Sequence, residues 1–355
     1  ACDGAPLILH VKGPKTWSPA SPFLYELSLE VVDSSGRVVD SVFSYAGMRK
    51  IHVEGNQVYL NNEKLYQRLV LDQGFYPDGI WTAPNEQALI RDIELSMAAG
   101  FNGARLHQKV FEERFYYWAD RMGYLTWGEA SSWGCDPSDI PSARLFLSEW
   151  QEIVVRDRNH PSLITWTPLN ETANGGIADA KQLGRFQRDL YTICKDLDPT
   201  RPVNEASGYV HTRTDLWTVH TYEQDPAKLK EQLTPDSEKG VWRNFPDLDI
   251  AYEGQPYIVD EFGGIKWIPP TDAAFADNSW GYGDAPKTLE EFYARLEAQV
   301  EVLLNLDHVC GYCYTQFTDV EQEQNGIYNY DRSEKFDMAR IRKVFGQNPD
   351  GYTKG

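Results

Sequence analysis

The chain has 355 residues, of which 41% are hydrophobic and 25% charged, which fits a soluble globular protein with one large domain or two ordinary ones. The net charge of −19 argues against nucleic acid or an anionic membrane as a partner, because both attract basic surfaces. No run of about 20 apolar residues is present that could span a membrane. Ala1 in place of an initiator methionine leaves both the cytoplasm and an exported location open.

The first 48 residues differ in pattern from the rest. Apolar and polar residues alternate over 23–32, a turn sequence occupies 33–36, and the alternation resumes over 37–43. This pattern predicts a β-hairpin with one buried face. Because about 48 residues are too few for an independent sheet, we expect residues 1–48 to be the last strands of a β-sandwich whose beginning is missing.

From residue 49 onward, short apolar runs alternate with helical patterns. Eight runs are expected to be strands: 65–71, 103–106, 124–127, 163–169, 202–204, 216–220, 257–260 and 309–315. Four amphipathic helices are expected over 87–99, 111–122, 178–197 and 288–306. Gly100 and Gly123 are expected to end the first two helices.

Strands separated by helices predict parallel pairing with right-handed crossovers. Eight such units favour a closed (β/α)8 TIM barrel over residues 49–355. An open doubly wound sheet is the alternative, but no glycine-rich phosphate loop follows the first strand. The long segments 221–255 and 262–287 follow the sixth and seventh strands, where a barrel carries its substrate-binding loops.

Two glutamates stand at the C-terminal ends of expected strands. Glu171 closes the run 163–171, and Glu261 closes the run 256–261. These strand ends face the mouth of a barrel, and a retaining glycoside hydrolase needs two carboxylates about 5 Å apart, one as proton donor and one as nucleophile. The pair therefore predicts such an enzyme, although either residue alone could be a solvated loop carboxylate or an ion-pair partner. Asn170 offers a donor and an acceptor suited to a sugar hydroxyl beside the bond being broken.

The residues around these glutamates resemble glycoside hydrolase family 2, the family of β-galactosidases, β-glucuronidases and β-mannosidases. The segments 166–171 and 259–263 are similar to the acid/base and nucleophile motifs of that family. Further similar segments are 17–27, 47–51, 60–65, 100–105 and 156–162. The resemblance covers nearly the whole chain, and it implies a TIM-barrel enzyme in which residues 1–48 end an immunoglobulin-like domain.

The resemblance also implies roles for individual residues. Glu171 would be the general acid/base, with a raised pKa, and Glu261 the nucleophile that forms a glycosyl-enzyme intermediate. Arg105 would be the cation that keeps Glu261 ionised, and Tyr222 the tyrosine that hydrogen-bonds this nucleophile. His220 could line the same pocket or be a packed histidine.

Several positions depart from the family. Thr315 stands where many members carry a tryptophan of the sugar subsite, although the following Asp319 is kept. Trp267 or Trp133 would then have to face the sugar, unless they are structural. Asp72 replaces a usual His-Glu pair and is a candidate for hydroxyl recognition.

Metal and uronide signatures of the family are not reproduced. His107 lies one residue before a histidine position of some β-galactosidases, and Trp133 occupies an acidic position, so we expect no catalytic metal and no cofactor. The Asn-x-Lys signature of β-glucuronidases is not evident, which disfavours a uronide substrate. Cys310 and Cys313 have CxxC spacing but lie in an apolar run, and are expected to be buried strand cysteines.

The sequence therefore predicts a retaining exo-β-glycosidase that acts on an oligosaccharide or glycoside, most like a β-galactosidase. The alternatives are β-glucuronidase or β-mannosidase specificity, and a non-catalytic carbohydrate-binding barrel. The family's leading sugar-binding domain is not represented, so the chain could be an incomplete enzyme. Its oligomeric state stays open.

Overall fold

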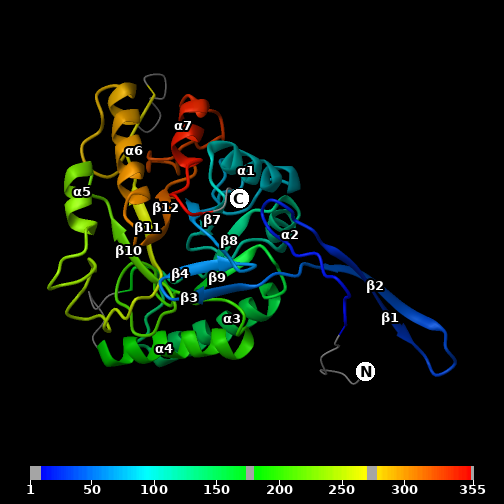
Figure 1. The fold of residues 1–355 in the computed structure, drawn as a ribbon. Coiled ribbons are helices and arrows are strands. Elements are labelled where there is room, and N and C mark those ends of the chain that lie inside the picture. The colour runs from blue at the N-terminus through cyan, green and yellow to red at the C-terminus, as the bar shows by residue number, and fades with distance from the viewer. Residues whose placement is uncertain (1–8, 173–179, 270–277, 353–355) are drawn as a thin grey trace.

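The computed structural model describes residues 9–172, 180–269 and 278–352. Figure 1 shows a curled sheet surrounded by helices, from which a two-stranded hairpin projects on one side. Among the described residues, no helix is long and apolar enough to cross a membrane.

Seven strands form the curled sheet, in the order β10-β11-β12-β6-β7-β8-β9, and every neighbouring pair is parallel. The first strand of the barrel in sequence, β6, thus lies beside the last, β12, as closure of a barrel requires. The strands are β6 (Gln67–Asp72), β7 (Gly103–Leu106), β8 (Leu125–Glu129), β9 (Leu163–Thr167), β10 (Trp217–Thr221), β11 (Tyr257–Gly263) and β12 (Val309–Thr315). This order confirms the predicted TIM-barrel class.

The prediction of a strand over 202–204 is wrong. This segment makes a single isolated bridge, which is parallel and joins Val203 to Trp166 of β9. Pro202 has no N–H to donate, and the N–H of Val203 is taken by the Asp215 side chain at 2.8 Å, so a regular ladder cannot form. The carbonyl of Val203 still accepts from the N–H of Asp215 at 2.9 Å, so the segment bridges the gap between β9 and β10.

Seven helices are present in the described part of the chain: α1 (Glu86–Ala99), α2 (Glu113–Met122), α3 (Ile140–Asp157), α4 (Ala180–Leu197), α5 (Pro226–Leu233), α6 (Leu289–Leu304) and α7 (Met338–Phe345). The four expected helices correspond to α1, α2, α4 and α6, except that 178–179 lie outside the described residues. Gly100 and Gly123 adopt φ values of 105° and 75° after α1 and α2, which confirms the predicted helix ends. The helices α3, α5 and α7 were not predicted.

The hydrophobic core has an inner and an outer part. The outer part packs the helices on the sheet. The inner part is shared by the barrel strands and a small sheet of β3 (Ile51–Glu54), β4 (Gln57–Leu60) and β5 (Glu63–Lys64). Cys310 and Cys313 belong to the inner part, and burial raises the pKa of the Cys310 thiol to about 12. They are buried strand cysteines, as predicted.

The N-terminal hairpin consists of β1 (Tyr25–Val32) and β2 (Val38–Ala46), paired antiparallel with Tyr25 opposite Ala46. The expectation of one buried face is wrong, since most of the apolar side chains of the hairpin are exposed, including Phe43 at 82%. The hairpin extends away from the barrel, so nothing in the described chain covers its apolar face (Figure 1). The assignment of residues 1–48 to a β-sandwich domain stays a prediction.

The inner core gives a stability prediction. Leu69→Ala should lower the free energy of unfolding by about 2–5 kcal/mol, because this fully buried side chain would leave a cavity inside the barrel. Leu29→Ala removes the same atoms from a hairpin side chain that is 46% exposed, and should change stability by less than about 0.5 kcal/mol. Guanidinium unfolding followed by tryptophan fluorescence compares the two variants. Equal losses would contradict this location of the core.

Candidate active site

A cavity of about 140 Å³ lies at the C-terminal ends of the barrel strands. Six of the residues singled out in the sequence line it: His107, Trp133, Asn170, Glu171, Tyr222 and Glu261. Thr315, the residue found in place of a family tryptophan, lines it as well. The parallel sheet explains this gathering, because it brings the ends of distant strands to one edge.

The two glutamates approach each other across this cavity. Glu261 belongs to β11 and its side chain is 5% exposed, whereas Glu171 follows β9 and is 27% exposed. One carboxylate oxygen of each lies within 4.8 Å of the other. Glu171 has a left-handed backbone with φ of 48°, uncommon for a residue other than glycine, and its N–H donates to the carbonyl of Ser207 at 2.9 Å.

The carboxylate of Glu261 is surrounded by donors and positive charge. Arg105 Nη1 lies 2.9 Å from Oε1, the Tyr222 hydroxyl donates to Oε2, and His220 Nδ1 lies 3.5 Å from Oε2. Burial alone would raise the pKa of the Glu261 carboxyl, but the charges of His220 and Arg105 outweigh it and lower the pKa to about 2. Glu261 is therefore an anion over the whole physiological pH range.

Arg105 is fully buried and joins the groups below the cavity. Its Nε donates to Glu129 Oε2 at 2.7 Å, and its Nη2 donates to Asn170 Oδ1. His107 Nδ1 lies 3.0 Å from Nη2. Sequence reasoning did not identify Glu129 as a site residue, although it ends the buried strand β8 just as Glu261 ends an apolar run. Burial opposes ionisation of Glu129, but Arg105 and His107 lower the pKa of this carboxyl.

His220 links the two glutamates to a further carboxylate, that of Asp260. Its Nδ1 lies 2.8 Å from Glu171 Oε1, and its Nε2 lies 3.3 Å from Asp260 Oδ1. Burial would lower the pKa of the imidazole, but Glu261 and Asp260 raise it to about 10. The ring passes close to Gly208, where a Cβ atom would lie 2.1 Å from it, so only glycine leaves room for His220.

Asp72 and Trp267, unlike Arg105 and His220, neither line the cavity nor contact the two glutamates. Asp72 Oδ1 accepts from the N–H of Gly74 at 2.8 Å, and burial together with the negative charge of Asp92 raises the pKa of Asp72 to about 6. Trp267 packs against the ring of Phe292 in α6, with centroids 6.5 Å apart. Nothing in this arrangement favours sugar contact by either residue.

The aromatic side chains at the cavity come partly from residues that sequence reasoning missed. Trp133 is 63% exposed at the rim and meets His107 edge-on at 5.4 Å. Trp280 and Tyr282 also line the cavity, and the Tyr282 ring stacks on Tyr222 at 3.4 Å. Both come from the long segment after β11, whose sequence carries no periodic pattern that would have distinguished them.

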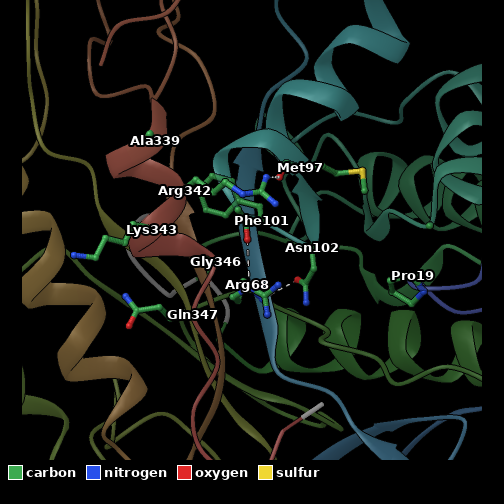
Figure 2. Close-up of a pocket in the computed structure, with 12 residues that line it drawn as sticks. Pro19, Arg68, Met97, Phe101, Asn102, Ala339, Arg342, Lys343, Gly346 and Gln347 are labelled. Carbon is green, nitrogen blue, oxygen red and sulfur yellow. Dashed lines mark hydrogen bonds between the residues drawn. The ribbon is translucent and has the colours of Figure 1, made fainter. Parts of the chain in front are cut away.

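A larger cavity of about 600 Å³ lies at the opposite, N-terminal ends of the strands (Figure 2). Arg68 and Arg342 beside it donate to carbonyl oxygens at the end of α1, those of Gly100 and Met97 among them. Their charges thus complement the negative end of a helix dipole. This cavity contains none of the carboxylates discussed above, and we interpret it as a packing groove.

Glu171, His220 and Glu261 could each offer one ligand atom to a metal ion. A divalent cation would have to displace the proton of His220 and would approach Arg105, which already pairs with Glu261. The donor set therefore fits an imidazolium between carboxylates better than it fits a metal.

The family model described as "Glycosyl hydrolases family 2, TIM barrel domain" matches residues 51–265, and "Glycosyl hydrolases family 2" matches residues 3–49. Curated relatives include a β-galactosidase of Vibrio vulnificus (strain YJ016), 29% identical over 72% of this chain and 24% of its own. A β-galactosidase of Lactococcus lactis subsp. lactis (strain IL1403) is 33% identical over 58% of this chain and 20% of its own. The chain thus spans about a quarter of the length of these relatives or less.

Solved structures share the fold at lower identity. A β-D-glucuronidase of Dictyoglomus thermophilum has a TM-score of 0.78 at 22% identity, covering 96% of this chain and 61% of that one. A β-galacturonidase of Eisenbergiella tayi bound to galacturonate has a TM-score of 0.76 at 20% identity, covering 95% and 60%.

The raised pKa of His220 gives a stability prediction. Because the folded-state pKa of about 10 exceeds the unfolded value of about 6.5, the imidazolium stabilises the folded protein fully at low pH, and this stabilisation is lost as the pH rises toward 10. The difference in free energy of unfolding between wild type and His220→Asn should therefore be larger near pH 6 than near pH 9.5, by about 1 kcal/mol or more.

His308→Asn is the matched control for this measurement by urea unfolding. Burial lowers the pKa of His308, so the corresponding difference should not shrink over the same interval. A difference for His220→Asn that is independent of pH would contradict a buried imidazolium at this position.

Proposed function

The chain belongs to glycosyl hydrolase family 2, and we propose that it hydrolyses a terminal β-linked sugar with retention of configuration. The observation that carries the proposal is the approach of Glu171 and Glu261, with carboxylate oxygens within 4.8 Å of each other. Retaining glycosidases hold their carboxyl groups about 5–5.5 Å apart, whereas inverting ones need about 6.5–9.5 Å to admit a water.

In the proposed first step, Glu261 attacks the anomeric carbon and Glu171 gives a proton to the departing oxygen. The charges of Arg105 and His220 keep Glu261 in the ionised form that attack requires. The side-chain oxygen of Asn170 accepts a hydrogen bond from Arg105, while its amide nitrogen is buried without a protein partner. That nitrogen is free to donate to a sugar hydroxyl beside the reacting bond, where such a bond strengthens in the transition state.

In the proposed second step, Glu171 takes a proton from water, which then attacks the glycosyl-enzyme ester. The partly exposed position of Glu171 gives solvent access to this side chain, which the nearly buried Glu261 lacks. The contact of 2.8 Å with His220 holds the Glu171 carboxylate toward the reacting centre. The difference in exposure supports the assignment of the proton-transfer role to Glu171.

β-Galactosidase-like specificity is our proposal for the sugar, supported by the curated relatives of that name. The solved uronidase structures are at most 22% identical and support the fold alone, so uronides enter as the competing substrate class. A panel of aryl β-galactosides, glucosides, mannosides and uronides decides between them. A folded protein that binds these sugars and hydrolyses none would be the non-catalytic barrel.

The two proposed roles predict different responses to the leaving group. Glu261→Gln should lower kcat/KM at least about 10³-fold on every active glycoside, because no nucleophile remains. Glu171→Gln should cost about 10²–10⁴-fold on the phenyl glycoside, but much less in the first step on the dinitrophenyl glycoside, whose leaving group needs no proton. Burst kinetics with both leaving groups measure this contrast.

Glu231→Gln, on the exposed surface of α5, is the control and should retain wild-type kinetics. The assignment would be wrong if Glu261→Gln retained turnover, or if the loss in Glu171→Gln were the same for both leaving groups.

A further inference from the structure

A third carboxylate, that of Glu323, lines the cavity and has no role in the mechanism above. Gln73 Nε2 donates to Glu323 Oε2 at 3.2 Å, and Asn325 Nδ2 donates to Oε1 at 3.3 Å. Gln316 accepts from Gln73 at 2.7 Å and donates to Asn325 at 2.9 Å. These four side chains form a closed hydrogen-bonded ring that fixes the carboxylate at the cavity wall.

The ring lies at the C-terminal ends of β6 and β12, two neighbouring strands of the barrel sheet. Gln73 follows β6, and the other three members follow β12, so the carboxylate is supported from both sides. Trp280 lies beside it: its N–H donates to the carbonyl of Gln322 at 2.8 Å, and its carbonyl accepts from the N–H of Gln324 at 3.0 Å. Glu323 is therefore a rigid feature of the site with an aromatic residue next to it.

The charge of Glu323 is not neutralised by its surroundings. In the described part of the chain no lysine or arginine lines this cavity, and Glu323 forms no ion pair. His107 is the basic side chain of the lining, and its Nδ1 lies 3.2 Å from Glu129. Two amide donors leave about two of the roughly four acceptor positions of a carboxylate open. Glu323 is half-buried, so its carboxylate has lost part of its hydration, which is costly unless further donors complete its shell.

We propose that Glu323 binds hydroxyl groups of the sugar and makes the cavity selective for neutral glycosides over uronides. The inference rests on the proposed glycosidase function and narrows its substrate class. Sugar hydroxyls supply the donors that the carboxylate lacks. The carboxylate of a uronide would instead meet a like charge, with no free cation in the described lining to offset it.

The test compares an aryl β-galactoside with the corresponding β-galacturonide, which differ only in the oxidation state of the sixth carbon. Wild type should favour the galactoside in kcat/KM by at least about 10²-fold, the range that a few charge-dependent contacts supply. E323Q keeps the shape and removes the charge, and should reduce this ratio at least about tenfold. Glu321→Gln, an exposed neighbour in the same loop, should leave the ratio unchanged.

A binding measurement separates this inference from the proposed function. Titration calorimetry with a neutral galactose-configured iminosugar and its carboxylate analogue should show tighter binding of the neutral compound, and a smaller difference in E323Q. If that preference appears without turnover of any glycoside, the glycosidase proposal is wrong and the selectivity stands. If wild type prefers the uronide, or folded E323Q keeps the wild-type ratio, the selectivity proposal is wrong. If E323Q does not fold, the galactoside-to-galacturonide ratio of kcat/KM measured for wild type decides alone.

Discussion

The buried guanidinium of Arg105 is the interaction on which the site depends. It pairs with Glu129 of β8 at 2.7 Å and with Glu261 of β11 at 2.9 Å, while its own backbone belongs to β7. One cation thus connects three strands and orients the proposed nucleophile. Removing one member of a buried ion pair leaves an uncompensated charge, at a cost of about 3–5 kcal/mol. The geometry of the site and the stability of the strand ends are therefore linked.

The remaining charges follow from this arrangement. His220 supplies a second cation between Glu171, Asp260 and Glu261, and Gly208 provides the space for its ring. Near the reacting centre the carboxylates are matched by cations, which keeps Glu261 ionised. The carboxylate of Glu323 is hydrogen-bonded by side-chain amides and not paired with a cation, so this wall of the cavity stays negative and hydrogen-bond accepting. The two halves of the cavity thus suit different tasks, bond cleavage and sugar recognition.

The parts of the fold and site that were predictable are those with a local signal. Glu171 and Glu261 end apolar runs, and glycines end α1 and α2 as expected. Glu129 carries the same signal, because it ends the apolar run of β8. Asp72 carried it too, yet its side chain turns to the N–H of Gly74. Glu323 and Tyr282 could not be found this way, since non-periodic loops reach the cavity only through tertiary packing. The predicted strand over 202–204 does not form, because Pro202 lacks an N–H and the side chain of Asp215 takes the N–H of Val203.

The central claim is that Glu261 becomes covalently attached to the sugar. A fluorinated glycosyl fluoride that slows the second step should accumulate this intermediate, and mass spectrometry of the digested protein locates the adduct. We predict a single glycosyl adduct on the peptide that contains Glu261, at the Glu261 carboxylate. An adduct on Glu171, or steady turnover of the reagent with no adduct on Glu261, would contradict the account.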